Sequence, residues 1–283
     1  MDIVLNNDEV VVKAFNNNIV LVNVDNTEKI LFGKGIGFGK KSGGIIEKGT
    51  VVSKIFVIEE EDNRNNLFSV IEQTNEEFFG LCEEAIYEIS KEIKEEFNES
   101  IHIGLIDHLF LAIKRLKNNE KIDNPFLVQI QTLYNREYEL AEKVANKIGS
   151  EFNVVMPEDE IAFIALHIHS AIQDKKLSST MKNNYLGNTI VEYVEKRLGF
   201  TIDKKSLDYA RFLTHIKFAI QRIVENKKNT NELSDLIKSS FKESYDIAKD
   251  VAKIIERELE VEVDNGEVSF LAIHIERFKV FEK

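Results

Sequence analysis

Six histidines are the residues of this 283-residue chain best suited to reversible chemistry, and four of them form two matched pairs. His108 precedes His215 by 107 residues, and His167 precedes His274 by the same number. A neutral imidazole has a pKa close to physiological pH and is a competent nucleophile toward phosphorus. A phosphoryl group adds a charge near -2 to this small ring, so the four histidines are candidates for a switch at a helical interface.

The common separation comes from a repeat in the helical part of the chain. Three blocks match without a gap: "DHLFLAIKRL" (107–116) with "THIKFAIQRI" (214–223), "YELAEKVANKI" (138–148) with "YDIAKDVAKII" (245–255), and "DEIAFIALHI" (159–168) with "GEVSFLAIHI" (266–275). The same offset aligns Arg115 with Arg222 and Glu160 with Glu267. Duplication of an all-helical domain explains the repeat, with a boundary near residues 173–184.

Other interpretations of the histidines are weaker. A single histidine on an apolar helical face is more often structural than reactive, but matched placement in two repeats favours a function. A metal site at His167 and His169 is disfavoured, because two residues apart on a helix the rings point about 200° apart. His102 and His169 have no histidine at the matching positions and are expected to be structural or auxiliary. Asp107 precedes His108 and is a candidate to orient it.

The stretch "LFGKGIGFGKKSGG" (31–44) is the second candidate site, with glycine at 33, 35, 37 and 39. In an extended chain, alternate glycines leave one face bare, so that another molecule can lie against the backbone. The lysines between them can neutralise phosphates while Phe38 stacks on an unpaired base, which favours RNA binding over a loose loop. Nucleotide-binding loops are excluded, because lysine occupies positions 34 and 40 where those patterns require glycine.

The elements that must position these residues change character along the chain. Alternating stretches predict a small antiparallel sheet over the first 58 residues, with turns at 16–18 and 25–27. The polar stretch "EEEDNRNN" (59–66) is expected to be a linker. Beyond it the apolar period is helical. The predicted fold class is multidomain, a small all-β antiparallel domain followed by two homologous all-α helical-bundle domains.

Charge and composition restrict the kinds of partner and of site that the chain can have. The net charge of -12 argues against a protein that coats nucleic acid indiscriminately. Seven lysines against six acids give residues 1–56 a charge of +1 and leave -13 for the rest, so nucleic acid is expected to meet this head. Cys82 is the single cysteine, which excludes an internal disulfide and a zinc finger. No metal or cofactor is expected. We expect a cytoplasmic protein without membrane insertion, because neither a membrane span nor a signal peptide is evident.

The order of the motifs resembles the BglG/SacY family of transcriptional antiterminators. The resemblance rests on "VVVKAFNNNIVLV", "FGKGIGFGKKSG" and "KIF", followed by a doubled helical domain with a "DH" block and an "EIAFIALHI" block. It implies a co-antiterminator (CAT) RNA-binding domain over 1–58 and two phosphotransferase-system regulation domains, PRD1 over 67–172 and PRD2 over 180–283. The chain departs from the family by about eight extra residues, "MDIVLNND", before the first strand.

The resemblance also implies partners and site residues. It implies a homodimer that grips an RNA hairpin in a leader transcript and prevents the overlapping terminator from forming. By position, the RNA-contacting residues would be Lys13, Asn18, Gly33, Lys34 and Phe38. The phosphoryl acceptors would be His108, His167, His215 and His274. The donors would be the phosphocarrier protein HPr and a sugar-specific enzyme II permease. In the family, PRD1 phosphorylation usually inactivates and PRD2 phosphorylation often activates.

Two alternatives from other functional classes remain open at this point. A DNA-binding transcription activator can carry PRD domains, but its head would show a helix-turn-helix pattern instead of strands. An enzyme with a histidine-centred metal or phosphotransfer site would need further carboxylate or basic groups beside the histidines. We expect a phosphoryl acceptor and not an enzyme, so no catalytic residue is assigned.

Overall fold

The computed structural model divides into two compact units. The first comprises residues 1–124 and 136–176, and the second comprises residues 125–135 and 177–283. The chain therefore enters the second unit, returns to the first and enters the second again. The described residues are 3–24, 27–174, 176–225, 227 and 230–280.

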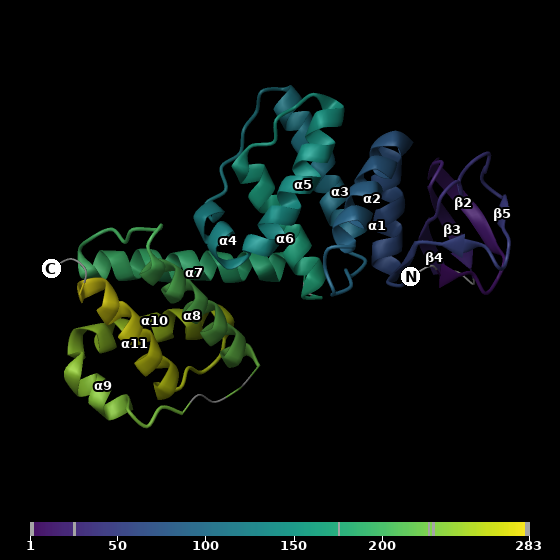
Figure 1. Ribbon diagram of the computed structural model, residues 1–283. Helices are drawn as coiled ribbons and strands as arrows, with labels where there is room; N and C mark the ends of the chain where they lie inside the picture. The colour runs from purple at the N-terminus through teal and green to yellow at the C-terminus, as the bar shows by residue number, and fades with distance from the viewer. Residues whose placement is uncertain (1–2, 25–26, 175, 226, 228–229, 281–283) are drawn as a thin grey trace. The chain divides into compact units, whose positions relative to one another are not determined.

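The N-terminal part of the first unit is built from short strands (Figure 1). These are β1 (Ile3–Val4), β2 (Glu9–Asn16), β3 (Ile19–Val24), β4 (Thr27–Phe32), β5 (Ile45–Ile46), β6 (Val51–Val52) and β7 (Lys54–Ile58). An antiparallel sheet has the strand order β5-β2-β3-β4-β7, and β1 pairs with β6. Alternation along the strands buries Val11, Val20, Val22 and Leu31 in one core. The predicted small antiparallel domain is confirmed.

The additional N-terminal residues extend this domain. Ile3 and Val4 pair with the β6 strand, and Leu5 lies in the core. Asp8 Oδ1 accepts a hydrogen bond of 2.7 Å from the backbone N–H of Lys48. Glu9 is buried, and its carboxylate lies 3.1 Å from Lys29 Nζ. Both acidic groups are therefore engaged inside the sheet domain.

Five helices of the described chain complete the first unit. They are α1 (Glu61–Gln73), α2 (Glu76–Ser90), α3 (Ile101–Lys117), α5 (Asn135–Phe152) and α6 (Glu158–Ile172). The expectation of a linker at 59–66 is wrong, because α1 begins at Glu61. The Glu99 carboxylate accepts the backbone N–H groups of Glu59 and Glu60, which fixes the chain before α1.

The second unit contains one helix that precedes α5 in the chain and the helices that follow α6. They are α4 (Leu127–Leu133), α7 (Leu177–Leu198), α8 (Leu207–Val224), α9 (Ser234–Ser240), α10 (Lys242–Leu259) and α11 (Asn265–Val280). Their core includes Phe212, Val251 and Ile275, with Val128 and Leu133 of α4 packed against it. None of the described helices combines the length and apolar character needed to cross a membrane.

The repeat read from the sequence is present in the helices. Moving along the chain by 107 residues takes α3 to α8, α4 to α9, α5 to α10 and α6 to α11, and α5 and α10 coincide end to end. The predicted pair of homologous all-α domains is confirmed. The helices that carry the paired histidines, α3 with α6 and α8 with α11, are therefore equivalent.

Candidate functional site

The glycine-rich segment is a series of tight turns, so the expectation of an extended chain is wrong. Backbone N–H groups of Ile36, Phe38 and Lys40 each donate to the carbonyl three residues earlier, at 3.1 Å. Gly35 and Gly39 have φ of 73° and 68°, which favours glycine. Lys34 and Phe38 each precede one of these left-handed glycines, so the two side chains occupy equivalent places in the first and third of these turns.

The turn between β2 and β3 holds the segment in place. The backbone N–H groups of Gly33 and Gly37 donate to the carbonyls of Asn18 and Asn17, both at 3.0 Å. Asn18 Oδ1 accepts a further bond of 3.0 Å from the N–H of Gly35. A Cβ at Gly37 would lie 2.1 Å from the Asn16 carbonyl oxygen, so only glycine fits there. Glycine is therefore required at position 37 because a carbonyl group of the protein itself lies against its backbone.

The structure brings four of the five expected RNA-contacting residues into this one feature. Lys34 is exposed, and the Phe38 ring is 74% exposed although it belongs to no core. Gly33 is buried below them, and Asn18 braces the turns while remaining exposed. An exposed aromatic ring and an exposed lysine in one series of turns offer stacking together with phosphate neutralisation.

The fifth residue, Lys13, faces a helix of the same unit. Its Nζ lies 3.2 Å from Glu76 Oε1 in the first turn of α2. Asn16 Nδ2 donates to Glu84 of the same helix at 2.9 Å. A cavity of about 350 Å³ separates the glycine-rich segment from α2, and its lining includes Asn18, Gly33, Lys34, Glu84, Tyr87 and Glu88. The expected RNA-binding edge is thus flanked by a helix that carries carboxylates.

The first histidine pair, His108 on α3 and His167 on α6, has ring centroids 5.3 Å apart. His108 Nε2 lies 3.1 Å from Glu160 Oε2, and Arg115 Nη2 donates to both Glu160 oxygens at 2.9 and 3.1 Å. Burial raises the pKa of Glu160, but its contacts with His108 and Arg115 outweigh burial and hold that pKa below its usual value. Glu160 therefore remains an anion against the ring of His108.

His167 is held as a neutral base. Desolvation, followed by the proximity of His108, lowers the pKa of His167 to about 3. Gly104 on α3 leaves room for the ring, since a Cβ there would lie 3.2 Å from His167 Nδ1. Among the described residues, no hydrogen bond joins Asp107 to His108, so Glu160 takes the place that the sequence suggested for Asp107.

The second pair, His215 on α8 and His274 on α11, is stacked, with ring centroids 3.8 Å apart. Arg222 donates through Nε and Nη2 to the two oxygens of Glu267, at 2.5 and 2.7 Å. Desolvation and the nearby His215 lower the pKa of His274 to about 4, and desolvation and Arg222 lower that of His215. At neutral pH both rings keep a lone pair available for attack on phosphorus.

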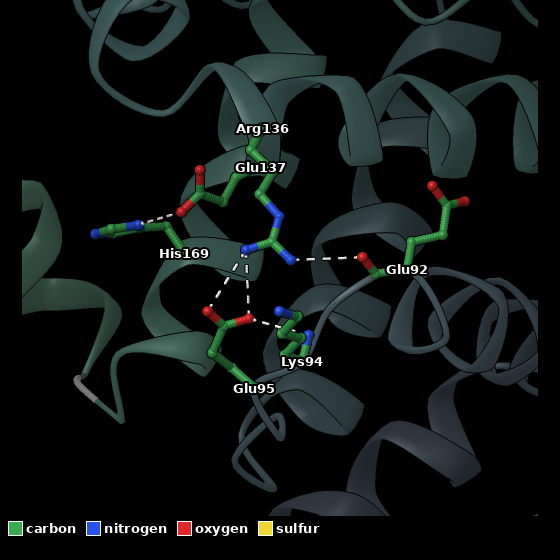
Figure 2. A network of polar contacts seen from close by, with 6 residues as sticks. All are labelled: Glu92, Lys94, Glu95, Arg136, Glu137 and His169. Atoms are coloured by element: carbon green, nitrogen blue, oxygen red, sulfur yellow. Dashed lines mark hydrogen bonds and ion pairs between the residues drawn. The ribbon is translucent and has the colours of Figure 1, made fainter.

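The two remaining histidines have structural partners. His102 is fully buried, with Nδ1 2.9 Å from both Glu83 oxygens and its ring 4.4 Å from that of Phe56. His169 Nδ1 lies 2.7 Å from Glu137 Oε1 (Figure 2). Figure 2 also shows that the neighbouring Arg136 reaches Glu95 in the segment after α2, so this network ties the start of α5 to the end of α6 and to that segment.

The second unit makes a contact equivalent to that of His169 with Glu137, but there the carboxylate is on the other helix of the pair. There Ser244 on α10 donates to Glu276 on α11 at 2.6 Å. The carboxylate therefore sits on α5 in one repeat and on α11 in the other, and no histidine is needed. This exchange explains why His169 has no histidine at the matching position.

Reasoning from the sequence did not assign a role to the Arg115–Glu160 and Arg222–Glu267 pairs, which brace the two histidine pairs. The signal was present, because the 107-residue offset aligns both arginines and both glutamates. Within the described residues, no group of three His, Cys, Asp or Glu side chains is arranged to hold a metal ion. His167 and His169 instead contact different helices.

Comparison with known proteins covers both parts of the chain. The PRD domain family matches residues 83–171 and 188–278, and the CAT RNA binding domain family matches residues 10–65. Protein GlcT of Staphylococcus saprophyticus is 35% identical over 274 residues, which cover 96% of this chain and 98% of that protein. Protein GlcT of Staphylococcus haemolyticus is 32% identical and covers 94% of this chain and 95% of its own.

A solved structure is similar to the N-terminal part. The crystal structure of GlcT CAT-PRDI has 39% sequence identity and a TM-score of 0.50. It covers 58% of this chain and 98% of the solved chain. A CAT domain joined to a PRD domain is thus found in the same order in both proteins.

Proposed function

Because the chain belongs to the BglG family of transcriptional antiterminators, with a CAT RNA-binding domain and PRD domains, we propose that it acts as a homodimer on a hairpin in a leader transcript. The chain is an RNA-binding antiterminator under phosphotransferase-system control. We assign RNA binding to residues 1–58 and regulation to PRD1 (67–172) and PRD2 (180–283). A leader transcript is met in the cytoplasm, where we expect the protein to act.

The RNA-binding proposal is carried by one observation, that a single braced series of turns exposes both the Phe38 ring and Lys34. An aromatic ring that is 74% exposed loses no core packing when a base stacks on it. Asn18 and Gly33 support the conformation of the segment from below. Lys13 contributes a further positive charge from β2 when it is not paired with Glu76.

The control proposal assigns phosphoryl transfer to the two histidine pairs. The lone pair of an imidazole nitrogen attacks phosphorus while the bond between phosphorus and the donor nitrogen or sulfur breaks and its electrons stay with the donor. The acceptor ring gives up the proton of its other nitrogen, and the released donor atom takes up a proton. The donors are HPr and an enzyme II permease of the phosphotransferase system. The lowered pKa values of His167 and His274 keep these rings unprotonated for the attack.

Phosphorylation has a direct structural effect in the first unit. A phosphoryl group on the His108 ring would meet the Glu160 carboxylate, which is buried and lies 3.1 Å from His108 Nε2. Like charges repel at this distance, so the Arg115–Glu160 contact between α3 and α6 has to rearrange. Such a change in helix packing is the kind of change that alters a dimer interface and, by linkage, RNA affinity.

The two other functional classes fit less well. The head is an antiparallel sheet, and in the described residues up to 60 no helix is present that could serve as a DNA-recognition helix. The carboxylate and arginine beside each histidine pair bind each other closely, which suits a structural brace for a phosphoryl acceptor better than turnover of a substrate.

Titration of a cognate leader hairpin tests the RNA-binding proposal. We expect Phe38→Ala to weaken binding at least about fivefold, because base stacking on an aromatic ring contributes about 1–3 kcal/mol. Lys34→Ala should weaken binding and lower the slope of log affinity against log salt by about one. Lys41→Ala, an exposed lysine of the same segment, is the matched control. Unchanged affinity of the first two variants, with an intact fold by circular dichroism, would refute the assignment.

A further inference from the structure

The second histidine pair lies between two ion pairs along the seam of α8 and α11. On one side, Arg222 binds Glu267. On the other side, Arg277 Nε and Nη2 both lie 2.9 Å from Asp208 Oδ1. Asp208 precedes the pair by two helical turns on α8, and Arg277 follows it by one turn on α11, so the two helices run antiparallel past the rings.

Asp208 holds a second arginine as well. Arg211 Nη1 lies 3.6 Å from the same Oδ1 atom. Arg211 stands one turn before His215 on α8, and Arg277 stands one turn after His274 on α11. Both arginine side chains are about half exposed, at 52% for Arg211 and 41% for Arg277, whereas the Asp208 side chain is 17% exposed. One carboxylate therefore restrains two arginines next to the rings, and the cluster keeps a charge of +1.

The first unit lacks this cluster. At the positions equivalent to Asp208, Arg211 and Arg277 it has Ile101, Gly104 and Ser170. Gly104 lies against the His167 ring, where the second unit has a long cationic side chain. Along this seam of the described chain, the first pair is accompanied by the Arg115–Glu160 contact, in which Glu160 is also engaged with His108.

We propose that Arg211 and Arg277 form a binding site for the phosphoryl group of the second histidine pair, that this group displaces Asp208 from the arginines, and that the first pair has no such site. The inference rests on the proposed function, in which the histidines accept phosphoryl groups. It adds two residues that bind the transferred group and one that competes with it.

Physical chemistry favours the displacement of Asp208 from the two arginines by a phosphoryl group. A phosphoryl group carries nearly twice the charge of Asp208 and has three acceptor oxygens, which match the forked guanidinium group. The displaced carboxylate is not left without a partner charge, because Asp208 lies in the first turn of α8, where the helix dipole stabilises an anion. Phosphate should therefore reside on the second pair at donor levels that leave the first pair mostly unmodified.

The test measures phosphate occupancy of each pair at equilibrium with a fixed ratio of phosphorylated to free HPr. Peptides that contain residues 215 and 274 are quantified by mass spectrometry in the full-length protein. We expect the double substitution Arg211→Gln with Arg277→Gln to lower the ratio of phosphorylated to free second pair about tenfold at low salt, and less at high salt where charges are screened. Asp208→Asn should raise it, because the arginines lose their competitor.

Controls separate this site from a general effect of charge or folding. Arg257→Gln removes an exposed arginine of α10 that pairs with Glu258, and it should leave the occupancy unchanged. Arg277→Lys, which keeps the positive charge, should retain part of the occupancy and serves where the double variant is poorly folded. A merely structural role of this cluster predicts that Asp208→Asn lowers occupancy together with the arginine variants, which would overturn the proposal.

The outcome also distinguishes this inference from the function on which it rests. Phosphoramidate, a chemical phosphoryl donor, and HPr are both applied to the wild-type chain. Absence of phosphate from all four histidines with both donors overturns the proposed function and the inference together. Phosphate on the second pair that persists at equal occupancy in the arginine variants overturns the inference alone.

Discussion

At the scale of single residues, the environment of each histidine decides what its ring can do. His167 and His274 are neutral at physiological pH because desolvation disfavours the charged ring. His102 is as buried as any histidine in the described chain, yet it is bound on Nδ1 by Glu83 and packs on Phe56. Burial alone therefore does not distinguish a phosphoryl acceptor from a structural histidine, and the partner groups do.

The low pKa of His167 predicts a dependence of stability on pH. The unfolded chain binds a proton on this ring near pH 6.5, whereas the folded chain does so near pH 3. The stability that the neutral His167 ring contributes is therefore fully present above pH 6.5 and is lost as the pH falls toward 3. The free energy of unfolding falls with a slope of up to about 1.4 kcal/mol per pH unit. Denaturant unfolding between pH 7.5 and 5 should show a smaller slope for His167→Gln than for the wild type.

His274→Gln provides the parallel case, since the folded pKa of His274 is about 4 and its effect has the same sign. Variant and wild-type slopes that coincide over this pH range would show that the His167 ring is accessible to protons in the folded state.

At the scale of elements, the sequence predicted the strands and the repeat well, because their signals are local periodicity and a fixed offset. The glycine-rich segment was expected to be extended, whereas Gly35 and Gly39 adopt left-handed angles in tight turns. Alternate glycines fit either conformation, and the contacts with Asn17 and Asn18, distant along the chain, decide between them. The start of α1 at Glu61 was missed because its first turn is polar and its brace, Glu99, comes from another part of the chain.

The acidic first turn of α2 predicts a restraint on RNA binding. Glu76 pairs with Lys13, and an exposed ion pair of this kind contributes up to about 1 kcal/mol. We expect Glu76→Gln to strengthen hairpin binding about twofold to fivefold at low salt, because Lys13 becomes free to meet a phosphate. Fluorescence titration at two salt concentrations measures this effect.

Glu77→Gln is the matched control, since it removes the same charge from the next, exposed position of α2. The gain should also vanish when Lys13→Gln is already present. A gain that persists without Lys13, or that Glu77→Gln reproduces, would mean that only the overall charge of α2 matters.

At the scale of the whole molecule, control requires that a change at the histidines alters how tightly the sheet domain holds RNA. A head of about 56 residues offers little surface for firm binding alone, so the second copy in the proposed dimer is the natural source of affinity. The two histidine pairs lie in different compact units. The two pairs can therefore bias the proposed dimer independently, each through its own helix seam.

Carboxylate substitutions test the sign of this control in the first unit. We expect His108→Asp with His167→Asp to lower antitermination severalfold in a reporter strain, because negative charge beside Glu160 disrupts the seam of α3 and α6. Lys114→Asp, which changes the charge by a similar amount on an exposed face of α3, should leave the reporter active. Full activity of the double variant would contradict the proposed inhibitory role.

The early position of α4 in the chain bears on how the protein emerges from the ribosome. Residues 125–135 are synthesised before α7, yet Gln129 donates to Asn184 and Val128 and Leu133 pack on the core of the second unit. Domains close as their residues become available during translation, from the N-terminus onward. Once residues up to 176 have left the ribosome, the first unit can be completed while the apolar side chains of α4 still face water, and they are covered only once the later helices have emerged.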